Sequence, residues 1–413
     1  MSKQISDLEI RKRFIVLILD GYGIGATVDA ALVRPQDVAA HTCLHIFEEI
    51  PELRLPNLEA LGLANAVGVD VPYLRKQSDV CWGKSALMHF GADTFYGHQE
   101  IMGTLPKKPH KRPFSEILPR VREMLIKSGY QVDIIGEQLK YLLVNGCVTI
   151  ADNIEADCGS AYNITATFDK ITFAEVLAIG KIVREIADVS RVIAFGGEAV
   201  EPSAILAAAE IKEENYIGIN APLSGVYDTG YLVQHLGYGI NAAVQVPKQL
   251  AAVGVKTILV GKVADIVENP DGESYSVVDT AETLEQALQC IKNSENAFVC
   301  INVQETDIAG HLQSAKIYAE KLLISDIYIK KIIALLNEDD VLLVTADHGN
   351  DPTIGHSQHT RENTPLLVFG KKVRAGFIGE RKTLSDIGQT VCSFFDTTKC
   401  ENGESFLKEI LCC

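Results

Sequence analysis

The chain has 413 residues, more than one ordinary hydrophobic core holds, and this length predicts two domains. Apolar residues make up 47% and charged residues 22%, a composition typical of globular rather than disordered proteins. The formal net charge of -16 excludes the basic surface of a nucleic-acid-binding protein and argues against an anionic membrane as a partner. Because this charge repels a phosphorylated substrate, local cations would have to capture one.

Targeting segments and cysteines point to a cytoplasmic protein. No apolar run reaches the roughly 18 residues of a membrane-spanning helix. The chain starts with Met1-Ser2-Lys3-Gln4, which mixes charged and polar residues, so no signal peptide is expected. The ten cysteines are scattered without a CxxC spacing and predict reduced core thiols, and the Cys412-Cys413 pair has no evident role.

The predicted elements fall into three series along the chain. The first contains a strand at 14–19, a glycine-rich turn at 21–25, a helix around 57–63 and a loop-rich stretch to about 103. Residues 104–113 hold three prolines and five basic residues, counting His110, and predict a linker rather than a plain surface loop. The second series has strands at 130–136, 148–151 and 191–195 and a helix at 173–187. The third has strands at 257–260, 297–303, 341–344 and 366–369 and an amphipathic helix at 316–336.

This alternation predicts an α/β protein with a mostly parallel sheet and helices on both faces. The middle series then forms a smaller α/β domain inserted into that core. We expect residues 1–104 and 227–413 to form the core and residues 105–226 to form the inserted domain.

Acids and histidines gather after three of the predicted core strands. These residues are Asp20 after the first strand, Asp307 and His311 after the strand at 297–303, and Asp347, His348 and His359 after the strand at 341–344. The carboxyl ends of parallel strands share one edge of a sheet, where ligands bind. Carboxylate and imidazole together suit manganese or zinc and suit calcium less well. Six such ligands exceed the needs of one tetrahedral ion, whereas a pair of ions, which serves phosphoryl transfer, would use them all.

Each of these positions alone has an ordinary structural explanation. An aspartate after a strand is usually a turn or helix cap, and a lone histidine is usually a satisfied core or surface residue. The Asp347–Asp351 run, Asp-His-Gly-Asn-Asp, together with Asp307-x-x-x-His311 is much harder to explain in that way. A dinucleotide site at residues 21–25 is rejected, because the spacing is GxGxG and Asp20 would face the pyrophosphate.

Thr94 is the candidate nucleophile for phosphoryl transfer through a covalent intermediate. It lies in Gly91-Ala92-Asp93-Thr94-Phe95-Tyr96-Gly97-His98-Gln99-Glu100, where Asp-Thr could open a helix whose backbone N–H groups hold a phosphate. Metal coordination would activate its hydroxyl. Considered alone, Thr94 is better explained as a helix N-cap.

Several of these segments resemble the phosphopentomutases of the alkaline phosphatase superfamily, relatives of the cofactor-independent phosphoglycerate mutases. The segments are 19–26, Asp93-Thr94, Gly97-His98, 346–353, 359–362 and 260–266. The resemblance covers well over half of the chain and implies an alkaline-phosphatase-like core with the inserted domain as a substrate-recognition cap.

The resemblance also implies roles for individual residues. Thr94 would be phosphorylated, and a sugar bisphosphate would prime it before phosphate is exchanged with the C1 or C5 oxygen of ribose, a reaction of nucleotide metabolism. Two Mn²⁺ ions are implied, with Zn²⁺ or Mg²⁺ as alternatives. Asp307, His311 and His359 would hold one ion, and Asp20, Asp347 and His348 would hold the other.

The chain departs from the family pattern around the phosphate. Ala92 replaces a lysine, Gln99 replaces a tryptophan, and Phe195-Gly196-Gly197 stands where an arginine and a proline usually follow RVIA. The Asp307–His311 spacing is one residue shorter than in most phosphopentomutases and matches the phosphoglycerate mutases. Lysine and arginine clamp phosphates, so these changes would weaken recognition of a pentose phosphate and spare the metals.

Three hypotheses follow from these observations. The first is a phosphopentomutase-like isomerase that acts on a small phosphorylated sugar, either the ribose phosphate of the family or an altered substrate. The second is a phosphatase, phosphodiesterase or phosphoglycerate-mutase-like enzyme on the same two-metal core, since a poorly closing cap would admit water as acceptor. The third is a catalytically silent protein that keeps its metals for stability.

Overall fold

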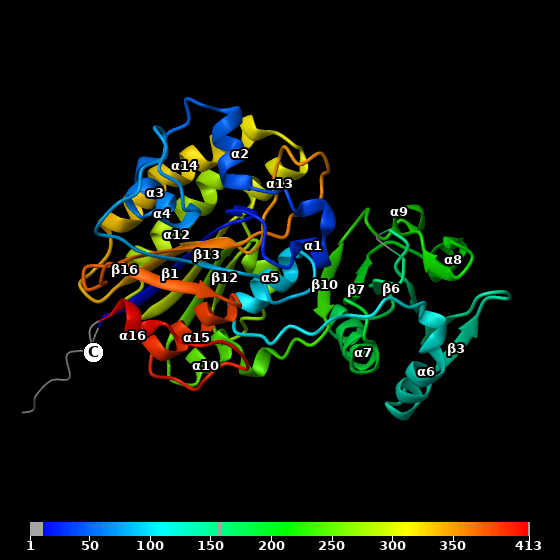
Figure 1. Cartoon of the computed structure of the whole chain (residues 1–413). Helices are drawn as coiled ribbons and strands as arrows, with labels where there is room; N and C mark the ends of the chain where they lie inside the picture. Colours follow the sequence, from blue (N-terminus) through cyan, green and yellow to red (C-terminus); the bar gives the residue numbers. More distant parts are fainter. Residues whose placement is uncertain (1–10, 156–157, 412–413) are drawn as a thin grey trace, which may run out of the picture. The chain divides into compact units, whose positions relative to one another are not determined.

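The computed structural model describes residues 11–155 and 158–411, in which the chain forms two compact units (Figure 1). Met1–Gln4 and the Cys412-Cys413 pair lie outside the described residues. The first unit joins the residues up to Pro106 to those from Asn241 onward, and the second is Lys107–Ile240. No helix among the described residues is long and apolar enough to cross a membrane.

The first unit is built on an eight-stranded sheet of order β12-β11-β13-β1-β14-β15-β2-β16. The strands in that order are Glu273–Tyr275, Lys256–Gly261, Ala297–Val303, Arg13–Leu19, Val341–Thr345, Thr364–Phe369, Cys81–Ser85 and Gly376–Arg381. Of these strands only β15 runs antiparallel to its neighbours. The predicted architecture, a mostly parallel sheet within an α/β core, is confirmed.

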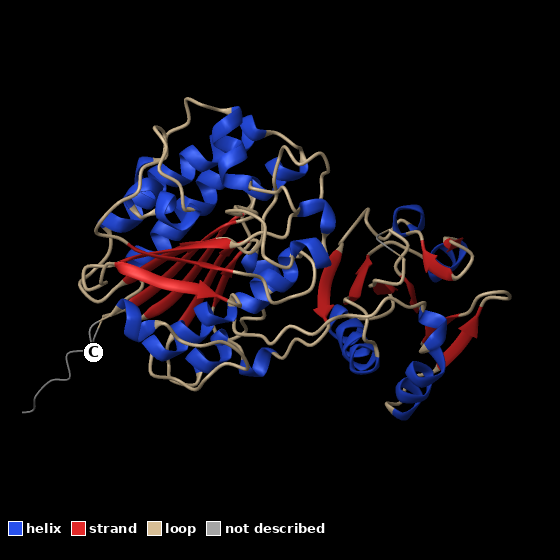
Figure 2. Ribbon diagram, in the orientation of Figure 1, coloured by secondary structure: helices blue, strands red, loops and turns tan. Residues whose placement is uncertain are grey.

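Helices cover both faces of this sheet (Figure 2). Alternate residues of β1 point to the two faces, so that Ile15 and Leu17 pack into one core and Phe14 and Val16 into the other. The first layer consists of α2 (Thr42–Glu49), α3 (Pro56–Ala60), α4 (Leu63–Val67), α12 (Thr280–Asn293) and α14 (Ala315–Ala334). The second consists of α10 (Val246–Ala251), α11 (Val263–Ile266), α15 (Ser385–Phe394) and α16 (Leu407–Ile410).

The single helix expected around 57–63 is two short helices. Gly62 adopts a φ of +97° between α3 and α4, in the left-handed region that ends a helix. A Cβ at this position would lie 2.9 Å from Val80 Cγ2. The turn therefore requires glycine, and the helical pattern does not continue through it.

The second unit has its own six-stranded sheet of order β10-β7-β6-β5-β4-β3. The strands in that order are Leu232–Gly237, Arg191–Gly197, Ala161–Thr167, Val148–Asp152, Tyr141–Val144 and Val132–Ile135. One face packs against α6 (Leu118–Lys127) and α7 (Phe173–Ile186). The other packs against α8 (Pro202–Ala207), α9 (Ala221–Ser224) and a hairpin of β8 (Ala209–Lys212) and β9 (Tyr216–Ile219).

The boundaries of this unit differ from the expected 105–226. The first lies inside the predicted proline-rich linker, at Pro106. The second lies after residue 240 rather than 226, a difference of 240 − 226 = 14 residues. The reason is that β10 pairs antiparallel with β7 and completes the second sheet. The role of this unit as a cap stays a prediction.

A buried ion pair between β1 and the turn before β14 holds the first unit's sheet together. Arg13 is 4% exposed, and its Nη2 lies 2.5 Å from Asp340 Oδ2. The Arg13 backbone N–H donates to Asp340 Oδ1 at 2.7 Å, and Asn337 N–H donates to Oδ2 at 2.6 Å. Removing one partner of such a pair leaves a buried charge without compensation.

Asp340→Ala is therefore expected to lower the free energy of unfolding by about 3–5 kcal/mol. Urea unfolding followed through Trp82, the only tryptophan in the chain, measures the change in the first unit. Asp339→Ala is the matched control, because Asp339 pairs with Lys372 at the surface. Equal effects of the two substitutions would contradict this role for the Arg13–Asp340 pair.

Candidate metal centre

Asp20 lies at the end of β1, in the middle of the edge predicted to bind ligands. It is fully buried, and its Oδ2 accepts from Asn302 Nδ2 at 3.0 Å and pairs with Lys262 Nζ at 3.0 Å. Asn302 comes from the neighbouring strand β13, in register with Ile18. The other carboxylate oxygen, Asp20 Oδ1, is buried without a hydrogen-bond partner.

Asp307 and His311 lie one turn apart on α13 (Glu305–His311), the helix that follows β13. Asp307 Oδ2 is 3.4 Å from His311 Nε2, and its Oδ1 is 3.3 Å from His359 Nε2. Asn350 Nδ2 donates to Asp307 Oδ1 at 2.8 Å and fixes the carboxylate. Burial alone would raise the pKa of Asp307, but hydrogen bonds to the two histidines and the charge of Lys262 lower it well below its ordinary value.

Asp347 and His348 follow β14 and are both fully buried. His348 Nε2 lies 3.2 Å from Asp347 Oδ2 and 3.4 Å from Asp20 Oδ1. The His348 ring stacks on the ring of His359, with the ring centroids 3.9 Å apart. The structure thus brings all six predicted ligands to one edge of the sheet.

The three histidines share one orientation that suits a metal ion. In each ring Nδ1 contacts a backbone carbonyl: Ser357 O at 2.7 Å for His311, Gly349 O at 2.9 Å for His348, and Ala92 O at 2.8 Å for His359. Donation from Nδ1 leaves the Nε2 lone pair for a ligand, the tautomer that metal-bound histidines usually adopt. The Nε2 atoms of His311 and His359 face each other at 3.0 Å, an arrangement that a cation between ligands would stabilise.

Two groups of potential ligand atoms emerge from this geometry. One joins Asp20, Asp347 and His348, and the other joins Asp307, His348 and His359, with all atoms of a group within 4.8 Å of one another. His348 Nε2, like Asp20 Oδ1, is buried without a hydrogen-bond partner. Buried polar atoms without partners are costly, so the residues present fit a bound cation. His311 lies at the more exposed end, with 42% of its side chain accessible.

Thr94 is the first residue of α5 (Thr94–Ile101) and is not its N-cap. Asp93 takes that role by accepting from Tyr96 N–H at 3.1 Å, which corrects the N-cap explanation of Thr94. The Thr94 hydroxyl instead donates to Asp347 Oδ2 at 2.8 Å and lies 3.4 Å from His98 Nδ1. The candidate nucleophile therefore lies against the candidate metal ligands.

A glycine in α5 allows this close approach. Gly97 lies one turn after Thr94, where a Cβ would be 2.6 Å from the carbonyl oxygen of Asp347 and 2.9 Å from its Cβ. Real Cβ atoms do not approach that closely, so any larger residue would move the helix away from the loop after β14. The segment before α5 is held by Arg361, which donates to His89 O at 2.8 Å and to Gly91 O at 2.6 Å.

Lys262 is the main functional candidate that the sequence-based ligand set did not include. Its Nζ lies 3.0 Å from both Asp20 Oδ2 and Asp307 Oδ2. Burial would lower its pKa, but the three neighbouring carboxylates raise it above the ordinary value. Lys262 directly follows β11, so the strand-end argument applied to this strand would have found it.

Two of the departures from the family pattern have structural explanations. Ala92 is buried, and its backbone carbonyl accepts from His359 Nδ1. Gln99 is buried in a network of its own, donating to Ile266 O at 2.9 Å and accepting from Gln245 Nε2 at 2.5 Å. The polar side chain of Gln99 is thus fully accommodated by hydrogen bonds inside the first unit.

Comparisons with known proteins identify the family of the chain. The family model described as "Metalloenzyme superfamily" matches residues 12–399. The phosphopentomutase of Vibrio parahaemolyticus is 30% identical over 96% of this chain and 100% of its own length. The chain belongs to the phosphopentomutase family. The phosphopentomutase of Clostridioides difficile is 29% identical over 95% of this chain and 98% of its own.

Solved structures show more distant likeness. A phosphoglycerate mutase from Leishmania mexicana has a TM-score of 0.46 at 12% identity, over 97% of this chain and 98% of that one. The alkaline phosphatase of the Antarctic bacterium TAB5 has a TM-score of 0.37 at 11% identity, over 94% and 98%. Family membership rests on the sequence relatives, and it makes the protein a metal-dependent phosphomutase, an isomerase that moves a phosphoryl group within its substrate.

Gly97→Ala is expected to lower kcat by about 10²-fold, because a displacement of about 1 Å at a reacting group has an effect of this size. Isomerisation of a pentose phosphate measures kcat, and thermal unfolding checks that the variant folds. Gly254→Ala is the control, since a Cβ at Gly254 meets nothing within 4 Å and adds only backbone strain. If Gly97→Ala keeps the kcat of Gly254→Ala, α5 does not depend on this close approach.

Proposed function

We propose that the six clustered side chains hold two divalent ions, with Mn²⁺ as the metal. The first ion would be held by Asp20, Asp347 and His348, and the second by Asp307, His311 and His359. The observation that carries this proposal is the shared histidine orientation, in which every Nδ1 contacts a carbonyl and every Nε2 faces the carboxylates. Carboxylate and imidazole ligands together favour Mn²⁺ or Zn²⁺ over Ca²⁺.

We also propose that Thr94 is the nucleophile that carries the phosphoryl group. Its hydroxyl proton points at Asp347 Oδ2 at 2.8 Å, which leaves an oxygen lone pair for attack on phosphorus. The backbone carbonyl of Thr94 contacts His98 Nδ1 at 2.8 Å, which holds the first turn of α5 in place. The N–H groups of this turn favour a phosphate at the same position.

The proposed reaction converts ribose 1-phosphate to ribose 5-phosphate through phosphothreonine. A sugar bisphosphate first phosphorylates Thr94, and the phosphoryl group then passes between Thr94 Oγ and the C1 or C5 oxygen of the sugar. Bound metal ions would neutralise charge on the phosphoryl oxygens and lower the pKa of the Thr94 hydroxyl. Lys262 supplies a fixed positive charge at the same edge of the sheet.

The proposed substrate class is a small phosphorylated sugar, which is wider than the ribose phosphates of the family reaction. Where the family has an arginine after RVIA, Phe195 is buried against Tyr227 and Tyr231, with ring centroids 6.0 and 6.2 Å away. A Cβ at Gly196 would overlap the carbonyl oxygen of Ala166, so this part of β7 has no room for a longer side chain. An aromatic group in place of a cation supports a changed sugar preference.

Thr94→Val is expected to abolish isomerisation, because it removes the hydroxyl while keeping the shape of the side chain. Thr94→Ser is the matched control and should retain activity and form a phosphorylated peptide when treated with a sugar bisphosphate. Metal content, measured by elemental analysis, should equal that of the wild type in both variants. Full activity of Thr94→Val would disprove the nucleophile assignment and leave the metal assignment standing.

A further inference from the structure

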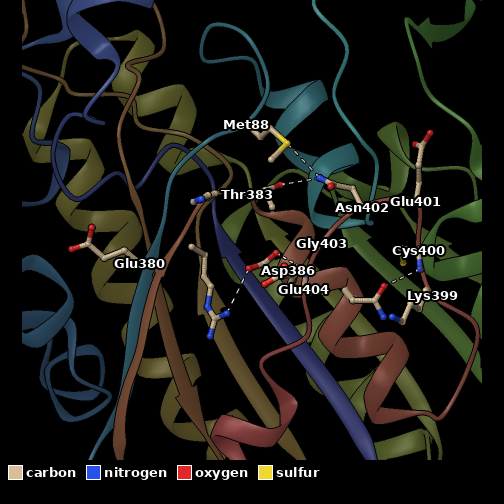
Figure 3. A pocket seen from close by; sticks show the side chains of 13 residues that line it. Met88, Glu380, Thr383, Asp386, Lys399, Cys400, Glu401, Asn402, Gly403 and Glu404 are labelled. Carbon is tan, nitrogen blue, oxygen red and sulfur yellow. Dashed lines mark hydrogen bonds and ion pairs between the residues drawn. The ribbon is translucent and has the colours of Figure 1, made fainter.

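A cavity of about 520 Å³ lies in the first unit, and none of its lining residues belongs to the metal centre (Figure 3). It is formed by the start of α15, the end of β16 and the loop that follows α15. Figure 3 shows Cys400 at this cavity, and its backbone N–H donates to the side chain of Gln389 at 3.1 Å. Cys400 lines the cavity and is half-buried, whereas Cys392 is fully buried and does not line it.

The sulfur of Cys400 lies 3.3 Å from the sulfur of Cys392. A disulfide needs a separation of about 2.05 Å, so a change of roughly 1.3 Å would bring the two atoms to bonding distance. Cys392 is on α15 and fully buried. The turn between the cysteines is closed by Thr397 N–H, which donates to the carbonyl of Cys392 at 3.0 Å. Small side-chain movements therefore suffice, and the backbone already holds the two cysteines together.

The two thiols have different environments. The hydrogen bond with Cys400 and burial raise the pKa of Cys392. Cys392 therefore remains a protonated thiol as long as the thiol of Cys400 is unmodified. Cys400 lines the cavity together with charged side chains of both signs, the cations Arg381, Lys382 and Lys399 and the acids Glu380, Asp386, Glu401 and Glu404. A reagent that enters the cavity therefore meets Cys400 first, and Cys392 stands behind it as the resolving thiol.

We propose that Cys392 and Cys400 form a reversible dithiol–disulfide pair that is oxidised by a low-molecular-weight disulfide of the glutathione disulfide class. This modification site does not rest on the proposed function. Cys400 loses its proton and attacks one sulfur of the reagent, breaking its S–S bond and releasing one thiol that takes up the proton. Cys392 then loses its proton, attacks Cys400 Sγ and displaces the second thiol. The two protein thiols are oxidised to one disulfide while the reagent is reduced to two thiols.

The bond would form at the C-terminal end of the helix that carries Thr94. Asn402, two residues after Cys400, donates its backbone N–H to Gly103 O at 3.0 Å, just beyond α5. A Cβ at Gly103 would overlap the side chain of Cys400. The end of α5 therefore packs directly on the segment that the disulfide would restrain.

Treatment of the full chain with glutathione disulfide tests the proposal. The Cys412→Ser/Cys413→Ser double variant serves as the background, so that these two thiols cannot exchange with the pair. Peptide mass mapping is expected to find Cys392 joined to Cys400, and dithiothreitol should reverse the bond. In the same background Cys392→Ser should stop at a mixed disulfide on Cys400. Cys158→Ser is the matched control and should leave the cross-link unchanged.

Two outcomes would overturn the proposal. Both are measured in the Cys412→Ser/Cys413→Ser variant, in which Cys392 and Cys400 are unchanged. In the first, Cys400 remains unmodified while other cysteines react, which would show that the cavity does not admit the reagent. In the second, Cys400 accumulates as a mixed disulfide beside an intact Cys392 thiol, which would show that Cys392 cannot resolve it.

Discussion

The candidate metal centre depends on three carboxylates brought together at one edge of a parallel sheet. Asp20, Asp307 and Asp347 follow β1, β13 and β14, which are adjacent in the strand order β13-β1-β14. All three are buried, so their mutual repulsion is poorly screened, and like charges in such a site need compensation. Lys262 and the surrounding imidazoles provide part of it. The remaining buried acceptor atoms, Asp20 Oδ1 and His348 Nε2, would be compensated by a bound cation.

A further buried carboxylate, Glu362, organises the loops behind the candidate ligands. It accepts hydrogen bonds from Gly25 N–H at 2.9 Å, Thr42 N–H at 2.9 Å and Thr360 Oγ1 at 2.6 Å. Burial raises its pKa, and these donors lower it in part. A Cβ at Gly349 would overlap the Glu362 side chain, so the loop after His348 must carry glycine there to pack this closely. The candidate ligands are thus positioned by backbone contacts to a central acid as well as by their own strands.

Much of this arrangement could be predicted from the sequence, because the strands that carry the ligands are buried on both faces and read as continuous apolar runs. The sequence does not predict strand β2, since it is short, half-buried and interrupted by Gly83. Asn302 could not be found by pattern, because it lies inside a buried strand and acts only through its contact with Asp20. The sequence predicts an end of the second unit that is too early, because β10 is largely exposed and its pairing with β7 cannot be read from local sequence. Side-chain partners across the sheet edge depend on strand order, which local sequence does not contain.

The most direct test of the two-ion centre is anomalous diffraction from crystals grown with Mn²⁺, measured above and below the manganese absorption edge. The account predicts two anomalous peaks at the sheet edge. One should contact Asp20, Asp347 and His348, and the other should contact Asp307, His311 and His359. A single peak, or peaks bound to other residues, would contradict the assignment of these six side chains as the ligands of two metal ions.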